Sequence, residues 1–562
     1  MLSMQFGVSI FGVVLTVAAF MIGLGLGSLA GVRWAMRISK PLAWFALLEM
    51  LIALYSLLLP GLEQAMGGWM NGIATRLTLA QWYLLQGGEA LCLLVAPAFA
   101  MGLSFALVLK AVDRTPLSLG KLYGLNTVGG AAGALFPLWS LSALGWGNSV
   151  RFVALLGLAI GATAMALLYL IRDSHGEHVP KSFQQSKPPF SALIIYAGIG
   201  AGSIMLEVCW IRLYGMIMLR TEYVLGVILS VFLLGIALGS MLLPRTHRQW
   251  LTVILPLVAG MGVLASLWLL PAVSAWVEKS QFQSFLGATW TQALILGIFT
   301  LPVTLSLGAW LPLLAGRFAG AEASGVWLYG ANCLGGAAGA VIACLLLIPS
   351  IGSTGTVAIA GLAIASLGLL WVNSRRVWLA IAVMVMIAWH LRSMPPVHDL
   401  LPQIEAGSRD LYLYEDAISM TQVIQQRDGQ RVLLSDLQRM DASSDPSAVE
   451  IQMDQARLAL LIHPAPRSVL FLGLGTGISM AGSAPFPDLQ RSAVELSRGS
   501  IVAARTWFAP VNHNIMDQAQ TQRDDARHFL ITSKNKYDVI VGDLFHPDLA
   551  GMGSLLSVQQ FQ

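Results

Sequence analysis

VLFLGLGTG at residues 469–477, with AVELS at residues 493–497, decides how the second half of this chain folds. The run VLFL is short and apolar and stops at glycine, a pattern typical of a buried β-strand followed by a tight turn. Glycines in such a turn let a ligand approach the backbone closely. The next predicted strand ends in an acidic residue, which can accept hydrogen bonds from ribose hydroxyls. We therefore predict a nucleotide-type site that includes Gly473, Gly475, Gly477 and Glu495.

Strand and helix patterns alternate around this segment. Residues 411–426 and 431–436 flank Asp428-Gly429, which predicts a β-hairpin, and a helix is expected over 448–462. From residue 468 onward the alternation predicts a parallel, doubly wound sheet, that is, a Rossmann-like domain of the methyltransferase type. Ile478 stands where a dinucleotide fingerprint requires its third glycine, which disfavours NAD. Strands are expected at 468–472, 491–496, near 513–516 and at 537–542, with helices at 498–508 and 526–532.

The composition is that of a membrane protein with a polar C-terminal part. The 562-residue chain is 56% hydrophobic and 11% charged, whereas a soluble domain is about 25% charged. The net charge of +4 is too small to indicate nucleic-acid binding, and the four cysteines lie in apolar segments without metal-ligand spacing. We predict a polytopic membrane domain over residues 1–395, a linker with a β-hairpin and helix over 396–467, and the Rossmann-like domain over 468–562.

Eleven apolar segments are long enough to span a bilayer, and a weaker twelfth lies at 377–391. The eleven are expected at 8–31, 41–60, 83–109, 120–143, 149–171, 190–216, 222–243, 250–272, 289–316, 325–349 and 354–373.

The membrane segments repeat. KLYGLNTVGGAAGAL at residues 121–135 recurs as WLYGANCLGGAAGAV at 327–341, with ten of fifteen positions identical, and FMIGLGLGS at 20–28 recurs as FLLGIALGS at 232–240. We interpret this as a duplication, with halves at about 8–171 and 190–373, on the plan of major-facilitator-like transporters. The helix at 200–215 has no counterpart in the first half.

Glycines in the repeated motif predict tight helix crossings, because small residues let helix backbones approach closely in lipid. The glycines concerned are Gly129, Gly130 and Gly133 in the first half and Gly335, Gly336 and Gly339 in the second.

Four ionisable residues fall inside the apolar segments: Glu49, Glu89, Glu207 and Arg212. Such residues are costly in lipid and often functional. Glu207 and Arg212 lie five apart, which leaves open a loose pair, a pair across helices, or carboxylates that face a cavity for a cationic substrate.

Basic residues follow alternate predicted helices, which makes those loops cytoplasmic and the N-terminus external by the positive-inside rule. As a helix, residues 377–391 would cover only about 22 Å, short of a bilayer core of about 30 Å. We therefore predict that this segment is interfacial and that the C-terminal domain is cytoplasmic.

Four motifs of the C-terminal part, in this order and spacing, resemble the polyamine aminopropyltransferases, the spermidine synthase family. They are VLFLGLGTG, AVELS, RDDARHFL at 523–530 and YDVIVGDLFHP at 537–547. The resemblance covers about residues 410–562. The whole layout resembles bacterial proteins in which such a domain follows a major-facilitator-like membrane region, which implies a multi-pass protein of the bacterial inner membrane.

The resemblance implies roles for individual residues. Glu495 would hold the ribose of decarboxylated S-adenosylmethionine, Asp525 the adenine amino group with Asp524 beside it, and Asp543 would orient and deprotonate the attacking amine. Gln438 and His546 fall on the acceptor side. The donor, or S-adenosylmethionine itself, is expected as a co-substrate and not as a tightly bound cofactor. The expected partners are the lipid bilayer, the nucleoside donor and a polyamine-like acceptor, with oligomers possible and no nucleic acid.

The chain also departs from the family pattern. Thr476 replaces the aspartate of the glycine loop, and Gln452 and its neighbours replace a Tyr-His-Glu element, so the nucleoside side is retained and the polyamine side largely lost. The family continues beyond the last residue, Gln562, so an incomplete C-terminal domain is expected. Two alternatives to an aminopropyltransferase stay open: a transporter of polyamines or related cations with a nucleoside-binding regulatory domain, and a methyltransferase-like protein or inactive relic.

Overall fold

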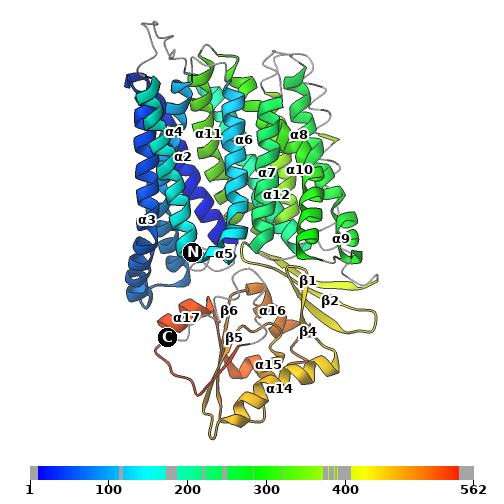
Figure 1. The fold of residues 1–562 in the computed structure, drawn as a ribbon. Helices are drawn as coiled ribbons and strands as arrows, with labels where there is room; N and C mark the ends of the chain where they lie inside the picture. Colours follow the sequence, from blue (N-terminus) through cyan, green and yellow to red (C-terminus); the bar gives the residue numbers. More distant parts are fainter. Residues whose placement is uncertain are drawn as a thin grey trace.

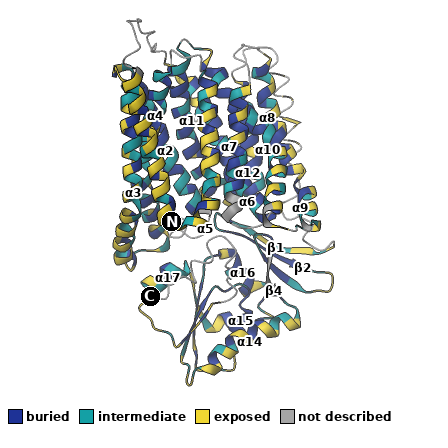
Figure 2. Cartoon of the chain, viewed as in Figure 1, coloured by how far each residue is buried: buried dark blue, intermediate teal, exposed yellow. Residues whose placement is uncertain are grey.

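The computed structural model describes residues 10–112, 118–171, 187–217, 222–242, 250–280, 284–318, 320–370 and 407–542, with a few isolated positions between these ranges. A helical bundle forms one half, and two β-sheets with their helices form the other half at one end of the bundle (Figure 1). Eight helices in the described ranges are long and apolar enough to cross a membrane. Many residues on the outer side of the bundle are exposed, whereas its centre is buried (Figure 2). This is compatible with a multi-pass membrane protein.

The helices of the bundle agree with the eleven segments predicted from the sequence. They are α2 (Ile10–Arg37), α3 (Pro41–Ala74), α4 (Leu79–Ala111), α5 (Leu119–Ile171), α6 (Phe190–Ile217), α7 (Glu222–Leu242), α8 (Leu251–Trp268), α9 (Leu270–Lys279), α10 (Phe285–Ala315), α11 (Ala321–Ile342), the π-helical turn η1 (Ala343–Leu347) and α12 (Ile348–Leu369). Most of the twelfth segment, 377–391, lies outside the described residues.

Two glycines break long helices at corresponding places. Gly145 in α5 has φ 71° and ψ 172°, and Gly352 in α12 has φ 75° and ψ 172°. A residue with a side chain rarely adopts this backbone conformation. The two arms of α5 that meet at Gly145 correspond to the separate segments predicted at 120–143 and 149–171, and Gly352 likewise separates the last two predicted segments.

Matching helix crossings occur in the two halves of the bundle. In the first half, a Cβ at Gly27 would collide with the carbonyl oxygen of Phe99, and one at Gly102 with that of Leu24. In the second half, the same holds for Gly239 with Leu305 and for Gly308 with Ile236. The repeated sequence is thus accompanied by repeated backbone contacts between α2 and α4 and between α7 and α10.

The prediction of tight crossings at the repeated GGxxG glycines is right for one half and wrong for the other. Gly335 and Gly339 on α11 abut the carbonyl oxygens of Ala197 and Ala201 on α6, leaving no room for a side chain. By contrast, Gly129 and Gly133 on α5 have nothing within 4 Å of a built Cβ. The difference between the halves is the contact with α6, which packs on α11 at Gly335 and Gly339.

The other half of the molecule contains two four-stranded sheets. The antiparallel sheet has the order β1-β2-β3-β4, and the parallel sheet has the order β7-β6-β5-β8. The strands are β1 (Arg409–Glu415), β2 (Met420–Gln425), β3 (Arg431–Ser435), β4 (Gln438–Ser443), β5 (Ser468–Leu472), β6 (Gln490–Glu495), β7 (Ala519–Arg523) and β8 (Val539–Gly542). The helices are α14 (Pro446–Ile462), α15 (Ile478–Ala481), α16 (Arg498–Thr506), the 3-10 helix η3 (Ile515–Gln518) and α17 (Ala526–Thr532).

Two predicted elements of this half need correction. The strand expected at 411–426 is two strands, β1 and β2, separated by a turn that Asp416 closes by accepting bonds from the N–H groups of Ile418 and Ser419. The strand expected near 513–516 is a turn leading into η3, and β7 follows it. His513 and Asn514 there have φ 55° and 54°, a left-handed conformation that cannot continue a strand.

Candidate functional site

The glycine loop lies at the carboxyl end of β5, next to β8 in the sheet. Gly473, Gly475 and Gly477 all have positive φ, at 84°, 53° and 75°. Buried Asn512 connects the loop to α16, because its amide donates 2.9 Å hydrogen bonds to the carbonyl oxygens of Thr476 and Ala504. In open α/β sheets, ligands bind outside the carboxyl ends of the strands, where the strand order reverses. The order β6-β5-β8 makes such a reversal beside this loop.

Glu495 reaches this loop as predicted from the sequence. Its Oε2 atom accepts hydrogen bonds from the backbone N–H groups of Leu474, at 2.8 Å, and Gly475, at 3.3 Å. Its Oε1 atom accepts one from Ser497 N–H at 2.7 Å. A carboxylate has about four acceptor positions. Three are therefore used by backbone N–H groups of the protein.

The two aspartates after β7 have local partners. Buried Asp524 accepts from Asp525 N–H at 2.8 Å and from the Gln522 amide at 3.0 Å, and it bonds His528 Nδ1 at 2.8 Å. Asp525 caps α17 by accepting from Arg527 N–H at 2.8 Å. Both residues are adjacent to the end of the strand that pairs with β6, since Asp524 N–H donates to the Glu495 carbonyl at 3.3 Å.

Three predicted residues of the acceptor side have different outcomes. Asp543 and His546 lie outside the described residues, which end at Gly542 on β8. Gln438 begins β4 directly after the turn at Asp436 and Leu437, both of which have positive φ.

The polar residues predicted inside the bundle do not form one group. Glu49 on α3 is half-buried, and Glu89 on α4 and Glu207 on α6 are buried. For Glu207 and Arg212 the sequence left open a loose pair, a pair across helices or carboxylates that face a cavity. In the structure the Arg212 guanidinium contacts Asp416, Glu415 and Asp436 in the other half of the molecule.

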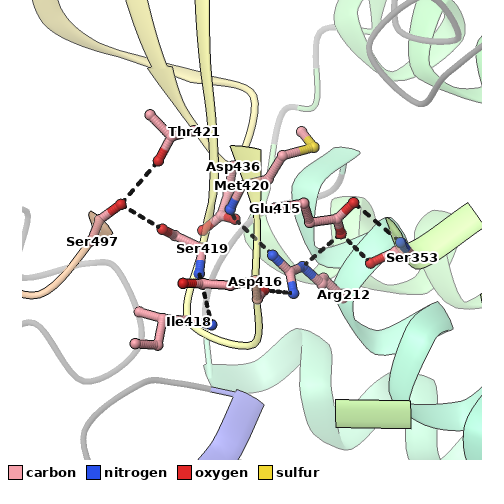
Figure 3. Close-up of polar contacts among 10 residues, drawn as sticks. All are labelled: Arg212, Ser353, Glu415, Asp416, Ile418, Ser419, Met420, Thr421, Asp436 and Ser497. Atoms are coloured by element: carbon pink, nitrogen blue, oxygen red, sulfur yellow. Dashed lines mark hydrogen bonds and ion pairs between the residues drawn. The ribbon is translucent and has the colours of Figure 1, made fainter. Parts of the chain in front are cut away.

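Arg212, near the C-terminal end of α6, is the centre of a polar cluster with the β1–β2 turn (Figure 3). Its guanidinium donates to the Asp416 carbonyl oxygen at 2.6 Å and lies 3.5 Å from Glu415 Oε1 and 3.8 Å from Asp436 Oδ1. Glu415 in turn accepts bonds from the hydroxyl and the N–H of Ser353, next to the break in α12. The cluster therefore joins two membrane helices to the antiparallel sheet.

The same turn and the start of β2 are bonded to Ser497, which follows Glu495 by two residues and caps α16 (Figure 3). The hydroxyl of Ser497 lies 3.1 Å from that of Ser419 and 3.0 Å from that of Thr421. On the other side of the turn, Arg523 bonds Asp416 Oδ2 at 3.4 Å. Burial and nearby Asp416 raise the pKa of Tyr414 in β1, so its hydroxyl stays neutral and able to donate. A continuous series of contacts thus leads from α6 to Ser497, whose N–H bonds Glu495.

Sequence reasoning missed Ser497 and Asp416. Ser497 has a local signal, because a serine directly before a helix is a common N-cap, and here its hydroxyl accepts from Ser500 N–H. Asp416 has a weaker signal, as an aspartate in a turn that accepts from N–H groups further along the chain.

A cavity of about 690 Å³ lies where the α3–α4 turn meets β7 and α17. Thr75 and Thr78 line it from the helical half, and Arg523, His528 and Lys534 from the other. The His528 ring lies 5.3 Å from that of Trp82 on α4, and its Nε2 has no hydrogen-bond partner among the described residues. The junction between the halves therefore has a second contact, between α4 and α17.

Comparisons with known proteins find partial similarity. No family model matches the chain, and no curated protein matches it. Similar solved structures include a spermidine synthase in complex with the transition-state analogue AdoDATO and the spermidine synthase from Thermotoga maritima. Each is 22% identical to this chain, with TM-scores of 0.24 and 0.23. The matches cover 26% and 25% of this chain and 51% and 48% of the other, so this chain spans about half the length of each.

Proposed function

We propose that this chain is a membrane-bound, spermidine-synthase-like protein whose C-terminal Rossmann-like domain binds an adenosine-type donor and transfers an aminopropyl group to a polyamine. One observation carries the proposal: Glu495 is held at the glycine loop of β5, at the carboxyl ends of neighbouring parallel strands. The acid and the glycines are the parts that such a site needs to bind ribose next to a backbone turn.

The Asp524–His528 pair supports the adenine end of the same site. Asp525 begins α17, and its capping bond to Arg527 N–H fixes the turn between β7 and that helix. Asp524 is bonded on both oxygens, so it holds the turn in place, and Asp525 is the better candidate to meet the adenine amino group.

The proposed transfer requires one further carboxylate, to accept a proton from the attacking amine. A polyamine nitrogen is protonated at neutral pH and cannot attack until it loses that proton. In the transfer, the free amine forms a bond to the methylene carbon next to the sulfonium, the carbon–sulfur bond breaks, and neutral methylthioadenosine leaves. Asp543 follows β8 directly and is the proposed acceptor of the proton.

A transporter with a nucleoside-binding regulatory domain is the second candidate, and one observation favours it. The matching crossings of α2 with α4 and of α7 with α10 fit a duplicated bundle of the major-facilitator type. The transporter and the enzyme differ in what they predict for Asp543, because replacing Asp543 would leave uptake or efflux by a transporter unchanged. A methyltransferase-like protein would instead prefer S-adenosylmethionine over its decarboxylated form.

Calorimetric titration of the purified full chain in detergent tests the proposal. The ligands are methylthioadenosine, S-adenosylmethionine and decarboxylated S-adenosylmethionine. We expect Glu495→Gln to weaken the affinity for the bound ligand at least tenfold. Glu450 is an exposed glutamate on α14, so Glu450→Gln is the matched control and should keep the native affinity. Asp543→Asn should bind the nucleoside but form no aminopropylated product. If none of the three ligands binds the native chain, the proposal fails.

A further inference from the structure

We infer that the C-terminal half, with the Glu495 site, lies on the extracytoplasmic side of the membrane. The inference comes from comparing the two ends of the bundle: one carries the sheets, and the other carries most of the basic residues. It replaces the cytoplasmic placement expected from the sequence, and it stands whether or not the site binds a nucleoside.

The end that carries the sheets is defined by contacts. Arg212 near the end of α6 bonds the Asp416 carbonyl, and Ser353 near the break in α12 bonds Glu415. Near the start of α4, the Trp82 ring lies 5.3 Å from the His528 ring on α17. The first arm of α5 also ends here, at Gly145, because the chain then turns back along α3, with Gly157 against Ala53 and Gly161 against Ala46.

The opposite end is defined by contacts that basic residues make with neighbouring helices. Lys110 at the end of α4 donates to the carbonyl oxygens of Ala35 and Ile38, where α2 ends. Arg33 on α2 and Lys187 just before α6 both lie over the Trp327 ring, at 5.7 Å and 5.2 Å. The ends of α2 and α4 and the starts of α6 and α11 therefore share this end.

Lysine and arginine are divided very unequally between the two ends. Among the residues that the structure describes, Arg33, Arg37, Lys40, Lys110, Lys121, Lys187 and Arg317 lie at the end away from the sheets, whereas Arg76, Arg151 and Lys279 lie at the end that carries them. In the sequence, the segments that connect helix ends away from the sheets add Arg114, Arg172, Lys181, Arg245 and Arg248, and the segment that connects α6 with α7 adds Arg220.

Short loops rich in lysine and arginine stay in the cytoplasm, and this bias sets the orientation of multi-pass proteins. The basic end is therefore cytoplasmic, and the sheets are outside. The start of α2 lies at the same end as the sheets (Figure 1). The two predictions from the sequence, an external N-terminus and a cytoplasmic C-terminal domain, are thus incompatible, and the charges support the first.

The chain path agrees with this orientation. Leu370 follows α12 at the basic end, and Gly407 precedes β1 at the other. Residues 371–406 join these two points, and in their sequence Arg375 and Arg376 come before the apolar run at 377–391. Arginines on this side of an apolar run favour a cytoplasmic position for the end of α12.

The orientation has a consequence that rests on the proposed function. A sulfonium nucleoside is made from S-adenosylmethionine, a product of cytoplasmic metabolism, whereas the site faces outward. A step that carries the nucleoside across the membrane must then come before the transfer, and the duplicated bundle on the same chain is a candidate for that step. The acceptor polyamine, by contrast, can reach the site from outside.

Cysteine labelling in the full chain tests the orientation directly. The four native cysteines are first replaced by alanine. Single cysteines are then placed at two exposed positions, Ser39→Cys in the α2–α3 connection and Glu450→Cys on α14. Intact bacterial spheroplasts are treated with a membrane-impermeant maleimide, before and after permeabilisation.

We expect Glu450→Cys to be labelled at least tenfold more than Ser39→Cys in intact spheroplasts, and both to be labelled equally after permeabilisation. The reverse pattern, or equal labelling in intact spheroplasts, overturns the inference. If the cysteine-free chain fails to accumulate, C-terminal fusions of the native chain give a second readout. Enzymatic activity of fused alkaline phosphatase supports the inference, whereas fluorescence of fused green fluorescent protein overturns it. Neither assay depends on ligand binding. A failure of the inferred orientation can therefore be distinguished from a failure of the nucleoside titration.

Discussion

The Arg212 guanidinium donates a 2.6 Å hydrogen bond to the backbone carbonyl of Asp416, and this contact joins residues 204 positions apart in the chain. It connects a membrane helix to the turn between β1 and β2. Arg212 is buried, as is Asp416, and Glu415 supplies a countercharge at 3.5 Å. A buried charge is stable only when its partners remove the cost of leaving water. The junction between the two halves therefore depends on this arginine keeping all its partners.

Replacing Arg212 by alanine should destabilise the junction strongly. Removing one partner of a buried ion pair typically costs about 3–5 kcal/mol, because the remaining charges are left unpaired. Arg212→Lys should lie between alanine and the native protein, since lysine keeps the charge but not the planar fork that reaches several acceptors. Thermal unfolding in detergent, with limited proteolysis between the halves, measures the effect. Arg457→Ala, which breaks an exposed pair with Asp454, is the control. Equal effects of Arg212→Ala and Arg457→Ala would contradict this account of the junction.

The two repeated GGxxG motifs should respond oppositely to the same substitution. Gly335→Ala places a methyl group against the Ala197 carbonyl and forces α6 and α11 apart, a kind of overpacking that costs about 1–3 kcal/mol. Gly129→Ala meets nothing within 4 Å and should be neutral or gain up to about 1 kcal/mol from better helix propensity. Melting temperatures of the two variants in one detergent compare them directly. A destabilised Gly129→Ala would mean that another helix occupies that face of α5.

The sequence predicted features that depend on neighbouring residues. The turn at Gly473 and the position of Glu495 follow from a strand, a glycine loop and a second strand within about twenty residues. The membrane segments follow from length and hydropathy alone. These local patterns carry their own physical cause, and the structure has them at the predicted places.

Features that depend on long-range packing could not be predicted from the sequence. Nothing near Arg212 in the sequence indicates that its partners lie at the ends of β1 and β3, so a partner on the same helix, Glu207, was only one of the alternatives left open. Likewise, the identical glycines at 129 and 335 differ only because α6 packs on one of them. The orientation of the C-terminal half also required knowing which helix ends it contacts.

His528 should stabilise α17 through its hydrogen bond to Asp524 and its ring contact with Trp82 near the start of α4. His528→Ala leaves the buried Asp524 carboxylate without its 2.8 Å partner, which costs about 1–3 kcal/mol. His528→Asn has an amide that can replace the Nδ1–H group, so it should recover most of that stability, although it loses the ring contact with Trp82. Hydrogen exchange of residues 519–532 in the purified protein distinguishes the two. If alanine and asparagine expose this segment equally, the hydrogen bond to Asp524 does not stabilise it.

Stability of the parallel sheet should fall in acid because of Asp538, the residue directly before β8. The Arg467 N–H lowers the pKa of this carboxyl below its ordinary value, and the Ser468 hydroxyl and N–H add to the effect. A carboxylate whose pKa is depressed by folding contributes stability above its unfolded pKa, about 3.9, and this contribution disappears as the pH falls through the lower folded value. Asp538→Asn should therefore melt below the native protein at pH 7, and the difference should shrink as the pH approaches 3. Exposed Asp517, replaced by asparagine, controls for charge removal alone. A melting difference for Asp538→Asn that stays constant between pH 7 and pH 3 would show that the carboxylate bonds to Arg467 and Ser468 do not link β5 to β8.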